Sequence, residues 1–124
     1  METKRISSGV KVIDELLNGG YECDGREITK FDRKEAKRAI EILIEKGANA
    51  IAVCGSFSCI YPKQEIKVQK LVKQIAGKDF PVSLSYEIGG IGFLERENST
   101  ILNSALQKSL KVGFRKLKKV LKRL

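Results

Sequence analysis

The chain has 124 residues, of which 42% are hydrophobic and 31% charged, values that suit one globular domain with a buried core. No apolar run approaches the roughly 20 residues of a membrane-spanning helix, and the opening residues lack the apolar part of a signal peptide, so we expect a cytoplasmic location. The chain contains no histidine and three cysteines without a Cys-x-x-Cys spacing. Cys-His catalysis within the chain is therefore excluded, and no metal site is expected.

The net charge of +9 is concentrated at the carboxyl end. Residues 108–124 carry eight basic groups and no acidic one, which leaves 16 basic against 15 acidic groups in the other 107 residues. Because the body is nearly neutral, any electrostatic partner would meet the last helix and not the fold as a whole. The aromatic content is only 6% and no recognition motif occurs, so neither a nucleic acid nor a membrane is an expected partner.

We predict a single α/β domain over residues 1–124, beginning with an extended and turn-rich lead-in at 1–31. Residues 4–13 alternate imperfectly around Gly9, and the turn-rich residues 18–27 are expected to form an exposed connection. A helix should begin after Asp32, since Asp32 and Glu35 have the spacing of a capping box. Its apolar face recurs at helical spacing and Gly47 would end it; the face comprises Ala36, Ile40, Leu43 and Ile44.

The middle of the chain predicts a strand–helix–strand unit. Residues 50–54 form a short apolar run typical of a strand covered on both faces. A helix should follow Pro62 and end at Gly77, and residues 80–86 should form the second strand. The helix has a buried stripe, which comprises Ile66, Leu71, Val72 and Ile75. The length of the unit, from about 50 to 86, predicts a parallel crossover within a small, mostly parallel sheet flanked by helices.

A long amphipathic helix is expected to close the chain, from about Glu95 to the end, after a bend rich in glycine. Residues 107–124 form its basic end. The apolar seam of this helix comprises Leu110, Phe114, Leu117, Leu121 and Leu124. The seam would pack on the domain, on a partner subunit or on an acidic membrane, and packing on protein is the first expectation. Apolar surface that is left uncovered also predicts self-association or a partner subunit.

Two segments contain candidate site residues. The loop 55–61 leaves the carboxyl end of a buried strand, where ligands commonly bind in α/β sheets, and offers Ser56, Ser58 and Cys59. It has no glycine fingerprint for phosphate, so an ordinary strand–helix connection is the alternative, and Cys54 is assigned to packing. The second segment places four polar residues at the start of the last helix, namely Arg96, Ser99, Thr100 and Asn103. The alternative there is capping by Asn98 or Ser99, with Arg96 in a solvent-exposed salt bridge.

The segment 32–106 resembles the amino-terminal region of hydantoinase A and 5-oxoprolinase proteins. The resemblance is carried by residues 50–54, by Phe57-Ser58 with Pro62 and Glu65, by residues 82–87, and by Glu95-Arg96 followed by Ser99-Thr100-Ile101-Leu102-Asn103-Ser104-Ala105. Residues 4–13 are similar to an extended segment that precedes these motifs in the family. The last motif is the most specific of the set.

The resemblance implies an actin/Hsp70-like α/β ancestry and ATP-dependent opening of cyclic amides such as hydantoins or 5-oxoproline, with a divalent metal. It places Arg96, Ser99, Thr100 and Asn103 at the active-site cleft. The sequence departs from the family in lacking its Asp-x-Gly-Gly-Thr phosphate motif, in having Gln64 where His is usual, and in residues 14–30, which look like an insertion.

We therefore expect a fragment or stand-alone relative of an ATP-dependent cyclic amide hydrolase that is not catalytic alone and needs no cofactor by itself. The alternative is a non-enzymatic interaction module that docks through its basic carboxyl-terminal helix onto a partner protein or an acidic surface. Binding of a small ligand at the 55–61 loop is a third, weaker hypothesis.

Overall fold

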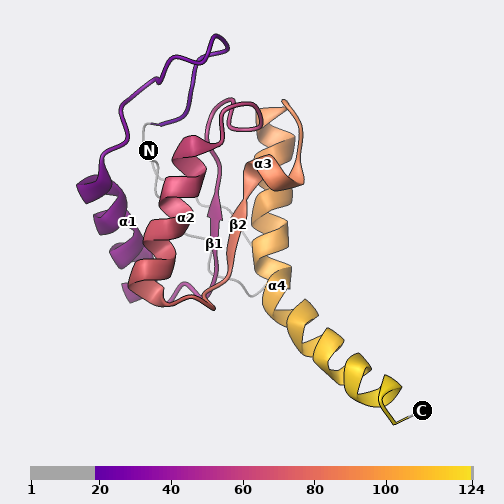
Figure 1. Cartoon of the computed structure of the whole chain (residues 1–124). Helices are drawn as coiled ribbons and strands as arrows, with labels where there is room; N and C mark the ends of the chain where they lie inside the picture. The colour runs from indigo at the N-terminus through magenta and orange to yellow at the C-terminus, as the bar shows by residue number, and fades with distance from the viewer. Residues whose placement is uncertain (1–18, 124) are drawn as a thin grey trace.

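The computed structural model describes residues 19–123 (Figure 1). The elements follow in the order α1 (Arg33–Glu45), β1 (Ile51–Val53), α2 (Lys63–Ala76), β2 (Val82–Leu84), α3 (Ser85–Ile88) and α4 (Phe93–Leu121). This order confirms the predicted α/β class, the central strand–helix–strand unit and the long last helix. The extended segment expected at 4–13 lies outside the described residues.

The strands β1 and β2 form a small parallel sheet between two helical layers. Ile51 is opposite Val82 and Val53 is opposite Leu84, and α2 makes the crossover between the strands. Helices α2 and α4 both contact the two strands, and α1 packs on α2 (Figure 1). The sheet is thus covered by α2 on one face and by the first half of α4 on the other, as a parallel sheet requires.

Helix α1 begins at the predicted cap and contributes to the apolar core. The Asp32 carboxylate accepts hydrogen bonds from the amides of Lys34 and Glu35, at 2.8 and 3.2 Å. Apolar side chains of α1, β1 and α2 form one buried cluster, which comprises Ala36, Ile40, Ile51, Leu71 and Val72. Burial of this cluster accounts for the packing of α1 against α2 and of α2 against the sheet.

The expectation that residues 18–27 form an exposed connection is wrong for Gly20 and Tyr21, which are buried. The Tyr21 amide donates to the Ser56 carbonyl at 2.9 Å, and the Gly20 amide donates to Gln64 Oε1 at 2.7 Å. Gly20 has φ +102°, and a Cβ at this position would lie 2.5 Å from the Ser56 amide nitrogen. Only glycine fits so close to the loop that follows β1, so this segment belongs to the packed body.

The second strand is shorter than the predicted 80–86. β2 ends at Leu84, and the chain turns at Ser85 into the single turn α3. The turn places the Tyr86 amide 3.3 Å from Glu65 Oε2 of α2, so its donor bonds a carboxylate and not a neighbouring strand. This hydrogen bond explains why Tyr86 does not continue the sheet.

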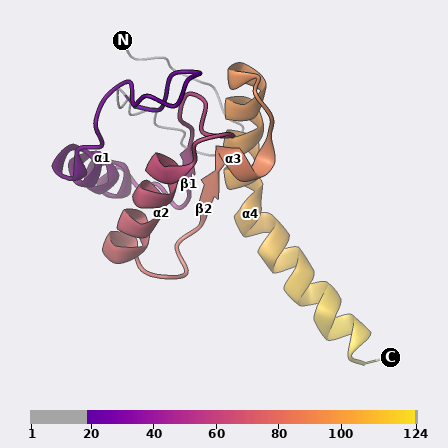
Figure 2. The same ribbon diagram turned by 45° about the horizontal axis from the view of Figure 1, so that its top comes forward.

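Helix α4 begins at Phe93, two residues before the predicted start, and its second half projects from the body (Figures 1 and 2). Each residue from 109 to 123 is exposed. None of the helices within residues 19–123 is long and apolar enough to cross a membrane.

The cap of α1 gives a direct test of local stability. Asp32→Ala should lower the free energy of unfolding by about 1 kcal/mol, because two first-turn amides lose their acceptor. Urea denaturation would measure the loss. Asp32→Asn is the matched control, since its side-chain oxygen can still accept, and should remain close to the wild type. An equal loss in both variants would instead assign the effect to the negative charge at the helix start.

Candidate functional site

A cluster of buried polar side chains lies where the carboxyl ends of β1 and β2 meet the starts of α2 and α4. Its members are at most 2% exposed: Ser58, Glu65, Ser85, Arg96 and Thr100. Buried polar groups are costly unless each finds a hydrogen-bond partner. The partners that these groups find determine how the loops around the strand ends are arranged.

Glu65, in the first turn of α2, accepts hydrogen bonds from both strand ends. Its Oε1 accepts from the Gly55 amide at 2.9 Å, from the Ser58 hydroxyl at 2.5 Å and, at close range, from the Ser85 hydroxyl. Its Oε2 accepts from the amide of Tyr86. Gly55 and Ser58 follow β1, whereas Ser85 and Tyr86 follow β2. The single carboxylate therefore joins the two loops at this edge of the sheet.

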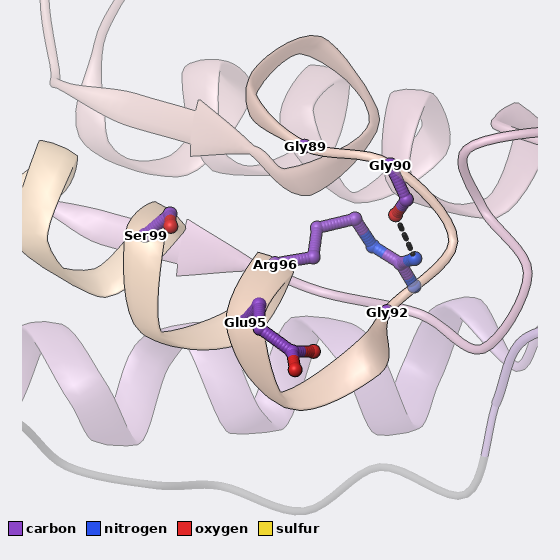
Figure 3. A pocket seen from close by; sticks show the side chains of 6 residues that line it. All are labelled: Gly89, Gly90, Gly92, Glu95, Arg96 and Ser99. Carbon is purple, nitrogen blue, oxygen red and sulfur yellow. Dashed lines mark hydrogen bonds between the residues drawn. The ribbon is translucent and has the colours of Figure 1, made fainter.

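Arg96 of α4 reaches the same edge from the opposite layer (Figure 3). Its Nε donates to the Ser85 hydroxyl at 3.1 Å, Nη1 to the Gly90 carbonyl at 2.8 Å, and Nη2 to the Gly55 carbonyl at 2.7 Å. The Ser85 hydroxyl accepts from Arg96 and donates to Glu65, so it connects a buried cation to a buried anion. The alternative that Arg96 forms a solvent-exposed salt bridge is therefore wrong.

Gly89 allows the bend before α4 to lie against Arg96. A Cβ at Gly89 would approach the Arg96 Cγ to 3.1 Å and its Cα to 3.3 Å. These distances are tighter than ordinary contacts, and the arginine is fixed by hydrogen bonds that leave it little room to move. The glycine thus keeps the bend close enough for the Gly90 carbonyl to accept from the guanidinium.

The other candidates on α4 take different positions. Thr100 donates to the Arg96 carbonyl one turn earlier at 2.6 Å, and Asn103 donates to the Ser83 hydroxyl of β2 at 2.8 Å. Asn103 therefore anchors α4 to the body, whereas the Thr100 hydroxyl bonds within the helix itself. Ser99 is exposed and lies with Arg96 on the wall of an open depression of about 330 Å³, which is lined by Gly89, Gly90, Gly92, Glu95, Arg96 and Ser99 (Figure 3). The assignment of all four residues to an active-site cleft stays a prediction.

Capping does not explain the polar residues at this helix start. Gly92 occupies the cap position of α4 and has no side chain with which to cap its first amides. Asn98 and Ser99 lie in the second turn, since the helix begins at Phe93. The alternative that Asn98 or Ser99 caps the helix is therefore wrong.

Several hydrogen-bonding groups of the loop 55–61 already have partners within the chain. Ser58 is buried against Glu65, the Ser56 carbonyl accepts from Tyr21, and Cys59 is a half-buried free thiol. Four of its amides are taken: the Gly55 amide by Glu65, the Ser58 amide by the Gly55 carbonyl, and the amides at 60 and 61 by the Phe57 carbonyl. The use of these four donors and the carboxylate behind them disfavour a phosphate group at this loop.

Cys54, at the end of the first strand run, is a half-buried free thiol. Burial raises the pKa of this thiol above its ordinary value, while the neighbouring Ser85 hydroxyl and the charge of Arg96 act in the opposite direction. A raised pKa keeps the thiol protonated at neutral pH and weakens it as a nucleophile. The structure thus favours packing over chemistry for Cys54.

Two residues of the cluster were not among the candidates from sequence, Glu65 and Ser85. A signal for Glu65 was present: it precedes Val68 by three residues and Val72 by seven, and so falls on the apolar face of α2. A charged residue on a buried helix face requires partners, and this requirement predicts polar neighbours from other elements. No comparable periodicity distinguishes Ser85.

The parallel strand–helix–strand unit, with a buried carboxylate organising its carboxyl edge, defines an α/β domain of the layered, sheet-centred class. The model of the hydantoinase/oxoprolinase N-terminal region matches residues 12–76, more than half of the chain, and the chain belongs to this family. The matched range includes residues 14–30, so that their being an insertion stays a prediction, and it ends before the motif at 95–105, whose resemblance also stays a prediction. No curated protein matches the chain.

The connection between Glu65 and Arg96 is open to a double-mutant cycle. Arg96→Met should lower the free energy of unfolding by about 3 kcal/mol, because it leaves a buried carboxylate without a countercharge and removes the guanidinium donor of the Gly90 carbonyl. Glu65→Gln in the same background should cost less than it does alone, with a coupling above about 1 kcal/mol in urea denaturation. Lys63→Met, at an exposed site of α2, is the control. Strict additivity would show that Ser85 does not link the two charges.

Proposed function

We propose that this chain provides part of the substrate side of an ATP-dependent cyclic amide hydrolase and is not catalytic alone. The observation that carries the proposal is the open depression between the glycine bend and α4, in a chain of the hydantoinase/oxoprolinase family. The depression shares Arg96 with the Glu65–Ser85–Arg96 network, so buried hydrogen bonds hold this part of its wall and the Gly90 carbonyl beside it.

The groups on the wall complement a cyclic amide. Glu95 brings a carboxylate that can accept from a ring N–H, and the exposed Ser99 hydroxyl can donate to a ring carbonyl. Arg96 donates a hydrogen bond to the Gly90 carbonyl, and this bond fixes its position in the wall of the depression. An amide ring has both a donor and an acceptor on adjacent atoms, which matches this pair of groups.

A second chain would supply the nucleotide chemistry. The sequence has no Asp-x-Gly-Gly-Thr motif, and four amides of the loop after β1 are occupied by Glu65 and by loop carbonyls. Both observations support a division of labour, in which this chain presents the amide and a partner subunit binds ATP and its metal ion.

The division of labour is tested by titration and by a ring-opening assay. Calorimetry with ATP and magnesium should show no binding by the isolated chain, and hydantoin and 5-oxoproline should remain intact. Activity should appear when a chain with the phosphate motif, encoded beside this one, is added. Ser99→Ala should then lower kcat/KM roughly tenfold through loss of one hydrogen bond, whereas Ser109→Ala, farther along α4, should not. ATP binding by the isolated chain would contradict the proposal.

A second proposed function is docking through the far half of α4, and the exposure of every residue from 109 to 123 favours it. The segment combines large apolar side chains, such as Phe114 at 65% exposure, with a basic remainder. Exposure of the apolar side of an amphipathic helix to water is unfavourable, and a bound partner would remove that exposure.

Removal of residues 108–124 tests the docking role. The truncated chain should keep its free energy of unfolding within about 0.5 kcal/mol, since exposed residues away from the core contribute little. Urea denaturation measures this. Sedimentation and binding to acidic surfaces should then differ between the full and truncated chains. If both are monomeric and neither binds an acidic surface or protein, the docking role fails.

A further inference from the structure

The projecting part of α4 has an apolar stripe with the spacing of a helix–helix seam. We call it the docking stripe, and its members are Leu106, Leu110, Gly113, Leu117 and Val120, with Phe114 and Leu121 alongside. The steps between the five members are four, three, four and three residues, which is the a/d pattern of a coiled coil. The six apolar side chains of the docking stripe are all 45–65% exposed.

The docking stripe is not the face that covers the sheet of this domain. The face of α4 toward the strands is formed by residues such as Arg96, Asn103 and Ser104, which bond Gly55, Ser83 and Ile51. At about 100° per residue, the five seam members centre roughly 100° around the helix from that inner face. Phe114 and Leu121 are on the same side of the helix as Arg96 and Asn103, but they lie in the exposed part that projects from the body. The sheet therefore accounts for the inner face alone, and the docking stripe requires a surface outside the described body.

Gly113 has no explanation within the described structure. It lies in the interior of α4, and a Cβ there would meet nothing within 4 Å. Glycine at an exposed interior position costs a helix about 1 kcal/mol relative to alanine. The missing side chain leaves a notch in the middle of the docking stripe, between Leu110 and Leu117. A notch at a seam position admits a large side chain from a closely packed partner helix.

Charge excludes a second copy as the favoured occupant. Lys111 and Lys118 border the docking stripe on one side and Lys116 on the other, and the sequence has no acidic residue after Glu97. Two copies packed along their stripes, parallel or antiparallel, would place lysine rows opposite lysine rows. Like charges across a helix pair are destabilising, whereas acidic rows would form favourable pairs.

We propose that the docking stripe packs against an acidic amphipathic helix of a different protein. That helix has leucine-like residues along its seam and Glu or Asp along both edges, and one large apolar side chain enters the notch at Gly113. The inference rests on the docking role proposed above and specifies its partner.

The test uses the full chain and a labelled probe peptide of about three heptads, with Leu at a and d and Glu at e and g. Fluorescence anisotropy should show saturable binding. Leu117→Gln should weaken binding at least tenfold, whereas Val112→Gln, on the opposite face, should leave it unchanged. The same apolar peptide with Lys at e and g should bind at least tenfold more weakly than the acidic one.

A matched pair of variants tests the notch at Gly113. Gly113→Ala and Val112→Ala should both raise helix content in circular dichroism, because alanine is the better helix former. Only Gly113→Ala should weaken peptide binding, roughly tenfold, through overpacking of the notch. Equal binding by the two variants would contradict the entry of a partner side chain into the notch. Equal binding of the acidic and lysine peptides would contradict the preference for an acidic partner.

Other occupants give distinct results. Concentration-dependent dimers that disappear in Leu117→Gln would assign the docking stripe to a second copy, and binding to phosphatidylserine vesicles without peptide binding would assign it to a membrane surface. Either result overturns the acidic-helix proposal while the docking role survives. Loss of the docking role itself would instead be seen as identical behaviour of the full and truncated chains.

Discussion

The arrangement of this domain depends on one buried carboxylate. Glu65 is 1% exposed, and a charged group in that position requires several donors. Its four donors come from the loop after β1 and the turn after β2. Satisfying them ends the second strand at Leu84 and turns the chain at Ser85. The same requirement brings Arg96 close, since the Ser85 hydroxyl donates to one charge and accepts from the other.

Much of the fold could be predicted because it follows from local rules. The Asp32 cap, the glycine stops and the apolar run at 50–54 depend on nearest neighbours and periodicity, and each was located from the sequence. The length of β2 and the burial of Gly20 were not predictable in this way. Both depend on partners far along the chain, Glu65 and Ser56, and no local pattern records which distant donor a carboxylate will take.

The candidate site, too, could be predicted where it follows from local patterns and not where it depends on distant contacts. Arg96, Ser99, Thr100 and Asn103 could be selected because polar residues at the start of a long helix are conspicuous. It could not be predicted that Arg96 and Asn103 bond the body whereas Ser99 is exposed, because this depends on which side of α4 faces the strands. Glu65 was within reach of sequence reasoning through its place on an apolar helix face. Ser85 became recognisable only when its two charged neighbours were seen together.

Helix α4 contacts the strands of its own domain through polar side chains. An ordinary surface helix turns its apolar side inward, but here the inner side is polar and bonds the strands through Arg96, Asn103 and Ser104. The large apolar side chains of the second half, bordered by lysines, are exposed because that half projects from the body. Hydrogen bonds are directional and fix the rotation of the helix, whereas an apolar stripe would tolerate several rotations. The polar inner side therefore holds α4 in one orientation about its axis, and that orientation determines where the docking stripe points.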